Sequence, residues 1–461
     1  MQRTIFITSF FGLSARNILS TSILDILGKD QNNRIVILAP QEKKENYQQY
    51  FLGNKKNVIV EGLNLKNTRM KTFAWTSESA SRLERFFFSL FLNSSDTKTR
   101  RVYRIAERFG AGYPLQAFFH WILAKLGNFK IFRRALRYLD FKILPKNRYA
   151  AYFEKYQPDL VFATDIFNEH DVQVMRGARA RRIKIVAMVR SWDNITSHGL
   201  NRIIPDKLIV NTPKVKEEAI RYNDIPAENI FISGIPHYDK YVARLRTSRA
   251  DLFRKLNLDP NKKTIFFAPP SDLYTEHNPV SLQAVKELRN LDDSQLILRL
   301  YMVGGINLGD TRPIPGKIAI DAPPQHINFM TADLAPKDDA HLADLLYHSD
   351  VVVAVASTLA IDAATLGKPV VFIGFDGDQR PYWKSLRRYY DFDHQRYLLN
   401  TGGVKLADNM GELVKYVKDY LNNPSLDMEN RKNINEEFCW KLDEKSGERV
   451  GNFLMSQLKN V

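Results

Sequence analysis

An apolar stretch near the middle of the chain is followed directly by polar side chains. Residues 183–189 (IKIVAMV) are apolar enough to form a buried strand, and residues 190–199 (RSWDNITSHG) carry many hydrogen-bonding groups. Such a cluster can hold a small polar ligand. A carboxylate such as Asp193 or an imidazole such as His198 can accept a proton from a reacting hydroxyl group. We predict that Asp193 is the catalytic base, with His198 as a second candidate.

Other candidates lie in and around this cluster. His170 follows the preceding apolar stretch and is a third possible base, and a turn-rich segment at 233–241 (SGIPHYDKY) contains one more histidine. We expect five residues to contact the ligand: Arg190, Trp192, Asn194, Thr196 and His237. The alternative is that the loop only caps a helix, with Asp193 or its neighbour Asn194 as the N-cap. A single histidine is also more often an ordinary polar residue.

A second polar group follows an apolar strand in residues 349–376 (SDVVVAVASTLAIDAATLGKPVVFIGFD). The strand ends at Ser357 and Thr358, where a helix begins that runs to Gly367. The first amides of a helix have no intrahelical acceptor, so they suit an anion such as a phosphate. Asp362 stands four residues after Thr358, on the same helical face, and can accept hydrogen bonds from a ribose. This spacing fits a nucleotide, although the two hydroxyl groups could also serve only as caps.

Short apolar stretches alternate with helical periodicity along the chain, which is typical of parallel sheets covered by helices. We predict an α/β fold with two Rossmann-like, doubly wound domains that face each other across a cleft. In such sheets ligands bind beyond the carboxyl ends of the strands, which explains why polar clusters follow the apolar stretches. The predicted strands are 4–10, 34–40, 57–63, 160–164, 183–189 and 207–212 in the first sheet, and 263–270, 295–302, 351–357 and 368–375 in the second.

The length of 461 residues exceeds what one hydrophobic core usually supports. We place the first domain at 1–236, the second at 237–425, and helices that pack back towards the first domain at 426–461. A single cysteine, Cys439, excludes a disulfide framework or a cysteine-based zinc site within one chain and favours a reducing compartment. No apolar run approaches the roughly 18 residues needed to span a bilayer, and the N-terminus lacks a signal-peptide pattern.

The net charge of +16 is concentrated in one segment. Residues 82–148 contain 15 Lys and Arg against 4 Asp and Glu, and they are rich in aromatic residues. We predict a basic, helical insertion at about 80–148, in which 129–144 forms an amphipathic helix. Its aromatic residues could be core, or they could lie in the interface of an anionic membrane surface. Binding to nucleic acid is not expected, because no recognisable nucleic-acid-binding motif accompanies the charge.

Four segments of the sequence resemble those of a known enzyme family. The segment 349–376 resembles the donor-binding segment of GT-B glycosyltransferases, most closely of the CDP-glycerol glycerophosphotransferase and bacterial surface-polysaccharide transferase group. That group has a similar apolar strand, paired hydroxyls, carboxylate on the helix and Gly-Lys-Pro. His237 and Tyr238 depart from its usual basic and polar residues. Three further segments resemble the group: 230–241, 264–275, and 438–454 with Asp443, Ser446 and Arg449 at matching places.

The resemblance implies transfer from a nucleotide-activated donor, bound by the second domain, to an acceptor held by the first. It implies phosphate ligands from Ser357, Thr358 and Ser271, with Arg299 or Lys337 as a cation. Asp362 would bind the ribose. The leaving phosphate gains charge in the transition state, and fixed donors and cations stabilise it, so no metal and no cofactor are expected.

Partners follow from the same reasoning. We expect a nucleotide-sugar or CDP-polyol donor, and a saccharide or lipid-linked acceptor of the cell envelope. The basic segment 82–148 would hold the enzyme on the inner face of the cell membrane, since each basic residue near an anionic surface contributes about 1 kcal/mol. The expected location is therefore cytoplasmic and peripheral.

Three alternatives remain open. A UDP-N-acetylglucosamine 2-epimerase shares the architecture and the donor site but needs no acceptor pocket. A CDP-glycerol or polyol-phosphate transferase uses the same helix start for another leaving group. A membrane-surface binding protein could retain the fold without catalysis.

Overall fold

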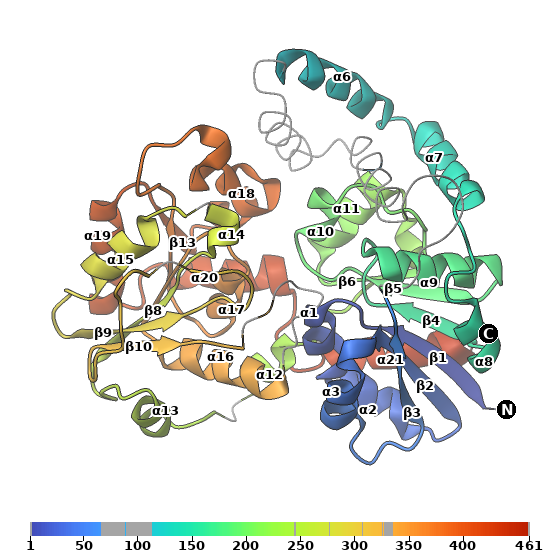
Figure 1. The fold of residues 1–461 in the computed structure, drawn as a ribbon, viewed down its shortest axis with the longest axis horizontal. Coiled ribbons are helices and arrows are strands. Elements are labelled where there is room, and N and C mark those ends of the chain that lie inside the picture. Colours follow the sequence, from blue (N-terminus) through green and yellow to red (C-terminus); the bar gives the residue numbers. More distant parts are fainter. Residues whose placement is uncertain are drawn as a thin grey trace. The chain divides into compact units, whose positions relative to one another are not determined.

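The computed structural model describes residues 2–65, 88, 113–243, 246–275, 277–306, 308–324, 326 and 335–459. The chain divides into two compact units. Unit 1 comprises Met1–His237 and Lys445–Val461, and unit 2 comprises Tyr238–Glu444. Each unit contains one parallel sheet with helices on it (Figure 1). The predicted pair of doubly wound, Rossmann-like α/β domains is therefore confirmed.

The sheet of unit 1 has seven parallel strands in the order β3-β2-β1-β4-β5-β6-β7. The order reverses between β1 and β4, as in doubly wound folds. Its inner strands are continuously apolar because helices cover both faces. The strands are β1 (Arg3–Thr8), β2 (Asn33–Pro40), β3 (Val58–Leu63), β4 (Leu160–Ala163), β5 (Lys184–Met188), β6 (Lys207–Val210) and β7 (Ile230–Ile232).

Local sequence signals start several helices of unit 1. Thr212 caps α11 through its side chain, which accepts from the Val215 amide, and Pro213 follows at the first helical position. Asn168 caps α9 in the same way, accepting from the His170 amide. The described helices are α1 (Gly12–Ser14), α2 (Ser22–Lys29), α3 (Lys44–Tyr47), α6 (Tyr113–Leu126), α7 (Lys130–Ile143), α8 (Ala150–Tyr156), α9 (Glu169–Ala180), α10 (Asn194–Ser197), α11 (Pro213–Asn223) and α21 (Ser446–Lys459).

The sheet of unit 2 has six parallel strands in the order β10-β9-β8-β11-β12-β13. They are β8 (Lys263–Ala268), β9 (Ser294–Arg299), β10 (Ile318–Asp321), β11 (Val351–Ala354), β12 (Val370–Ile373) and β13 (Val404–Ala407). The described helices are α12 (Tyr238–Val242), α13 (Arg249–Lys255), α14 (Asp272–Thr275), α15 (Val280–Leu288), α16 (Pro336–His348), α17 (Leu359–Thr365), α18 (Asp393–Asn400), α19 (Met410–Asn422) and α20 (Met428–Ile434).

The last helix, α21, belongs to the core of unit 1 although it follows unit 2 in the chain. Val450 and Leu454 lie in one buried cluster with Ile23 and other apolar side chains of β1, β2 and α2. The packing is close, because a Cβ atom built on Gly451 would lie 2.9 Å from the side chain of Ile26. We had placed the second domain's end at 425, whereas α20 lies in unit 2 and only α21 lies in unit 1.

The helix predicted at 129–144 is present as α7, but its orientation differs from a core helix. Arg133, Arg137 and Asp140 are buried, whereas Ile131 and Tyr138 are 74% and 61% exposed. The interpretation of its aromatic and aliphatic residues as core is therefore wrong for α7. The physical reason is that the arginines have a buried carboxylate partner, Asp224, at the C-terminal end of α11.

The ion pairs of α7 form a network on unit 1. The Arg133 Nη2 and Asp224 Oδ1 atoms are 2.5 Å apart, and Arg137 Nη1 lies 3.0 Å from Asp224 Oδ2. Asp140 in turn accepts from Arg176 and Arg202 at 2.6 and 3.0 Å. Polar contacts therefore hold α7 on unit 1, and its apolar face points outward.

The preceding helix, α6 (Figure 1), also exposes apolar side chains. Leu115, Phe118 and Trp121 are 64%, 56% and 51% exposed. The Lys125 ammonium group lies 3.8 Å from the centre of the Trp121 ring, a cation–π contact. The rest of the predicted basic insertion, 82–112 apart from Phe88, lies outside the described residues.

Candidate functional site

The strand–helix junction predicted to bind a nucleotide is present in unit 2. β11 ends at Ala354 and α17 begins at Leu359. The Ser357 Oγ atom accepts a hydrogen bond from the Leu359 amide at 3.2 Å, so Ser357 caps the helix. Thr358 occupies the N-cap position without a side-chain cap bond and is exposed. Its hydroxyl group therefore faces outward at the carboxyl edge of the sheet.

A buried tyrosine, Tyr390, forms hydrogen bonds with the backbone at this junction. The Tyr390 hydroxyl donates to the Ile373 carbonyl at 2.7 Å and accepts from the Ala356 amide at 3.1 Å. Burial raises the pKa of Tyr390, so the phenol keeps the proton that it donates. This bridge fixes the loop after β11 to the end of β12.

Asp362 has a partner that the sequence did not suggest. Its carboxylate accepts a 2.6 Å hydrogen bond from the hydroxyl group of Tyr238 on α12, and both residues are 4% exposed. The other candidate on that face, Thr358, is exposed. In this structure Asp362 joins α17 to α12, and its predicted contact with a ribose stays a prediction.

The remaining donor-site candidates lie along the same edge. Ser271 follows β8, the neighbour of β11, and its hydroxyl donates to the Gly305 carbonyl at 3.3 Å. Arg299 ends β9 and forms an ion pair with Asp321 at the end of β10. Lys337 is the second residue of α16 and is exposed.

Arg299 is one of several groups around Asp321. His341 lies 2.9 Å from the same carboxylate. Burial would raise the pKa of Asp321, but the hydrogen bond with His341 and the charge of Arg299 lower it overall. Asp321 therefore stays ionised. Its negative charge offsets the positive charge of Arg299, which was a candidate cation for binding a phosphate.

In unit 1, the predicted polar cluster lies at the carboxyl edge, as expected. Arg190 follows β5 and pairs with Asp165, which follows β4 and is buried. The Arg190 guanidinium also lies 4.1 Å from the centre of the Phe11 ring, after β1. Three neighbouring strands thus contribute to one group of side chains.

The loop after Arg190, whose residues we expected to contact the ligand, is largely buried. Trp192, Asn194 and Thr196 are 7%, 2% and 2% exposed because α10 starts at once and packs into the unit. Asp193 is half-buried and occupies the N-cap position of α10. Its carboxylate accepts from the Asn194 side-chain amide at 3.2 Å and does not cap the helix backbone.

The three histidine candidates have different surroundings. His170 is half-buried, and its Nδ1 atom lies 2.7 Å from the hydroxyl oxygen of Tyr149. His198 is exposed, with its ring 5.5 Å from that of Phe167. His237 is 3% exposed and is the last residue of this part of unit 1. His198 is the most accessible of the three.

A small pocket at this edge contains residues that the sequence analysis did not single out. It is lined by Ser14, Asn17, Ile18, Thr164, Met188, Arg190, Asn211, Ile235 and Pro236. Of these, only Arg190 was a candidate. The polar lining residues come from α1, from the helical turn Ala15–Leu19 that follows it, and from the ends of β4, β5 and β6. The position after a predicted strand was therefore an available signal for Thr164 and Asn211.

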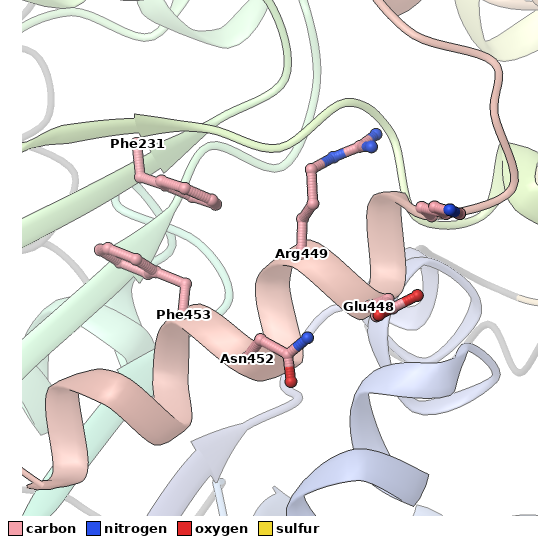
Figure 2. Close-up of a pocket in the computed structure, with 6 residues that line it drawn as sticks. Phe231, Glu448, Arg449, Asn452 and Phe453 are labelled. Carbon is pink, nitrogen blue, oxygen red and sulfur yellow. The ribbon is translucent and has the colours of Figure 1, made fainter.

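A larger pocket of about 380 Å³ lies between β7 and α21 (Figure 2). The Phe231 and Phe453 rings stack there with centroids 4.2 Å apart. The Arg449 Nε atom donates to the Ser233 carbonyl at 2.8 Å, and its Nη2 donates to Ser446 Oγ at 3.0 Å. The motif residue Arg449 therefore attaches α21 to the segment after β7, and Ser446 of the same helix accepts a second hydrogen bond from Arg449.

Part of this architecture resembles a known protein family. Residues 318–456 match the family model described as CDP-Glycerol:Poly(glycerophosphate) glycerophosphotransferase. This segment runs from β10 into α21 and includes β11 and α17. The matched segment covers less than a third of the chain, and the two Rossmann-like units give the chain a GT-B-like fold. No curated protein matches the sequence of this GT-B-like protein.

Solved structures share its fold over almost the whole chain. A UDP-GlcNAc 2-epimerase from Neisseria meningitidis bound to UDP-GlcNAc has a TM-score of 0.56 at 12% identity, covering 99% of this chain and 100% of that one. MnaA from S. aureus with UDP has 0.53 at 12%, covering 100% and 98%. The glycotransferase of kitacinnamycin has 0.52 at 12%, covering 99% and 100%. At these identities the likeness concerns the fold.

Two properties of the described residues bear on membranes and metals. None of their helices is long and apolar enough to cross a membrane. Within the same residues, no group of three or more His, Cys, Asp or Glu side chains is arranged to hold a metal ion.

Proposed function

We propose that this GT-B-like protein transfers a glycosyl or polyol-phosphate group from a nucleotide-activated donor to a hydroxyl group of a cell-envelope polymer. The observation that carries the proposal is the family-model match over 318–456, which contains the β11–α17 junction. The same match favours a polyol phosphate as the transferred group. Unit 2 would bind the donor and unit 1 the acceptor.

The chemistry needs a base for the acceptor and stabilisation for the leaving group. The acceptor oxygen attacks the donor, at phosphorus for a polyol phosphate or at the anomeric carbon for a sugar. The bond to the leaving nucleotide phosphate breaks, and the hydroxyl proton passes to the base. We propose Asp193 as the base because its half-buried carboxylate lies at the carboxyl edge of unit 1. Thr358 and the amides beside it would bind the leaving phosphate.

A transfer assay tests this function. Purified protein is incubated with CDP-glycerol, CDP-ribitol, UDP-GlcNAc or GDP-mannose and a polyprenyl-phosphate-linked saccharide acceptor, and products are followed by mass spectrometry. We expect transfer with one donor class, and about tenfold weaker donor binding in Thr358→Val. Ser425→Ala, an exposed serine elsewhere in unit 2, serves as the control.

The outcomes separate the alternatives. Conversion of UDP-GlcNAc to its 2-epimer without an acceptor would replace the proposal with an epimerase. Absence of both turnover and nucleotide binding would leave a non-catalytic binding protein.

We further propose that α6 and α7 lie on the anionic inner surface of the cell membrane. Half of the exposed large apolar side chains that the structure describes come from these two helices. Four exposed cations accompany them: Lys125, Lys130, Arg134 and Lys142. At about 1 kcal/mol each, these charges alone would contribute roughly 4 kcal/mol near such a surface.

The orientation of α7 supports this proposal. The helix α7 is attached to unit 1 through its arginines, so its aliphatic side chains point outward. This apolar surface is exposed to water unless a membrane or another protein covers it. Ile131 and Ile143 are both 74% exposed. Their insertion into the membrane interface would bury this area.

Vesicle co-sedimentation tests the membrane proposal. Binding to phosphatidylglycerol vesicles should exceed binding to phosphatidylcholine vesicles and should weaken as salt rises. Replacing both Ile131 and Ile143 by serine should reduce binding at least tenfold, because the buried apolar area is lost. Ile314→Ser, an exposed isoleucine of unit 2, is the matched control. Equal binding by both variants would contradict the proposal.

A further inference from the structure

The small pocket of unit 1 has the composition of a binding site for a polar group. It is lined by apolar residues such as Ile18 and Met188 and by the polar residues Ser14, Asn17 and Asn211. It lies at the carboxyl edge of the sheet, where ligands of doubly wound folds bind. The lining residues all belong to unit 1.

Two polar atoms in this wall have no hydrogen-bond partner among the residues that the structure describes. They are the hydroxyl oxygen of Ser14 and the side-chain oxygen of Asn211, in residues that are 1% and 3% exposed. Leaving a buried polar group without a partner is unfavourable, and one polar group in this pocket would give a partner to both atoms. The pair therefore points to a polar occupant.

Size limits what this occupant can be. The accessible volume of about 10 Å³ is close to what a single water-sized group requires. A phosphate group is too large for this space. The occupant must be a group with one oxygen atom, such as a hydroxyl or a water molecule.

Charge also argues against an anion. The only cation in the wall, Arg190, forms an ion pair with the buried carboxylate of Asp165. The Asn211 oxygen accepts hydrogen bonds and would repel an anion. A hydroxyl group suits both atoms, since it can donate to Asn211 and accept from the Ser14 hydroxyl.

We propose that this pocket is a subsite for one uncharged hydroxyl group of the acceptor, a sugar or polyol, and that Ser14 and Asn211 bind that hydroxyl directly. The inference rests on the proposed transferase function, because it assigns the hydroxyl to the acceptor. The bound hydroxyl is an orienting group of the acceptor, distinct from the one that reacts. It gives unit 1 a means to select polyhydroxylated acceptors.

Steady-state kinetics with the saccharide acceptor test the subsite. Ser14→Ala should raise KM for the acceptor about five- to tenfold, the effect of one lost hydrogen bond, and leave KM for the donor unchanged. Asn211→Ala should do the same. Ser20→Ala is the matched control, because Ser20 lies outside the pocket on the following turn and its buried hydroxyl also has no partner among the described residues.

Direct binding separates this inference from the proposed function. Saturation-transfer NMR with glycerol and ribitol should give signals for the wild-type protein that weaken in Ser14→Ala. 1,3-Propanediol, which lacks the central hydroxyl of glycerol, should bind more weakly than glycerol. These results would support the subsite even if no transfer reaction were found.

Two results would overturn it. One is a change in melting temperature in the Ser14 and Asn211 variants with unchanged acceptor KM and polyol binding, since this would mean that the pocket holds a structural water only. The other is transfer activity with an acceptor KM that none of the variants alters. If Asn211→Ala fails to fold, Ser14→Ala alone decides between these outcomes.

Discussion

The attachment of α7 to unit 1 predicts a large effect for one substitution, Asp224→Asn. The Asp224 carboxylate forms ion pairs with two buried arginines, Arg133 and Arg137. All three side chains are less than 10% exposed. Removing the charge leaves two guanidinium groups without their ionic partner. Breaking a buried pair in this way costs about 3–5 kcal/mol.

The remaining contacts place the effect near the lower end of that range. Arg137 keeps hydrogen bonds to Asn201 and to the Asn223 carbonyl, and Arg133 keeps one to the Gly127 carbonyl. We therefore expect a loss of about 3 kcal/mol, which corresponds to about 6–12 °C in the melting temperature of a unit of this size.

The effect should depend on pH in a defined direction. Burial raises the pKa of Asp224, but its hydrogen bonds with Arg133 and Arg137 outweigh burial and lower the pKa overall. A carboxyl group whose pKa is lowered on folding contributes stability above its unfolded pKa of about 3.9 and loses it as the pH falls through the folded value. The difference between wild type and Asp224→Asn should therefore be complete at pH 7 and shrink below about pH 4.

This prediction can be tested by calorimetry, which gives the melting temperature, and by limited proteolysis, which gives the cleavage rate. Trypsin cleavage within α7 should become about a hundredfold faster in Asp224→Asn if the helix opens locally, because 3 kcal/mol corresponds to that factor. Asp25→Asn is the control, since Asp25 pairs with Lys55 but is 62% exposed. A melting temperature and a cleavage rate equal to those of Asp25→Asn would refute the view that ion pairs hold α7 on unit 1.

Other substitutions test the sites and the core. Asp193→Asn should lower turnover about 100-fold and leave donor binding intact, in a transfer assay; normal turnover would reject Asp193 as the base. Tyr238→Phe should lower the free energy of unfolding of unit 2 by about 1.5–3 kcal/mol, because buried Asp362 loses a hydrogen bond. Urea denaturation measures this change. An effect no larger than that of Tyr382→Phe, at an exposed tyrosine, would contradict the prediction. Cys439 is fully buried and burial raises the pKa of its thiol, so Ellman's reagent should react only after denaturant is added. Fast reaction in native buffer would disprove that.

The sequence predicted the central strands and missed three at sheet edges. All ten predicted strands are present, whereas β7, β10 and β13 were not predicted. Each of these three lies at the end of a sheet, where a strand has a neighbour on one side only. Such strands are short, with three or four residues here, and need not be continuously apolar. Periodicity alone therefore gives little signal for them.

Side-chain partners from distant parts of the chain were harder still to predict. The pattern of α7 correctly indicated an amphipathic helix, but not which face packs, because the partner Asp224 lies about 90 residues away. In the same way, Asp362 showed no sign of its bond to Tyr238. Positions at strand ends were predictable from topology, whereas the Ser14 and Asn211 pocket depends on how the segments at the ends of five strands meet.

The position of α21 has a consequence for how the protein is made. The ribosome releases the first 237 residues of unit 1 long before it synthesises Val450 and Leu454, which complete the apolar cluster around Ile23. During this interval the growing chain carries a partly exposed core, while unit 2 is continuous and can finish folding by itself. Domains usually fold in order of synthesis, from the N-terminus onward. Here unit 2, the later-made unit, can be completed first, and the nascent N-terminal half is the part that would engage chaperones.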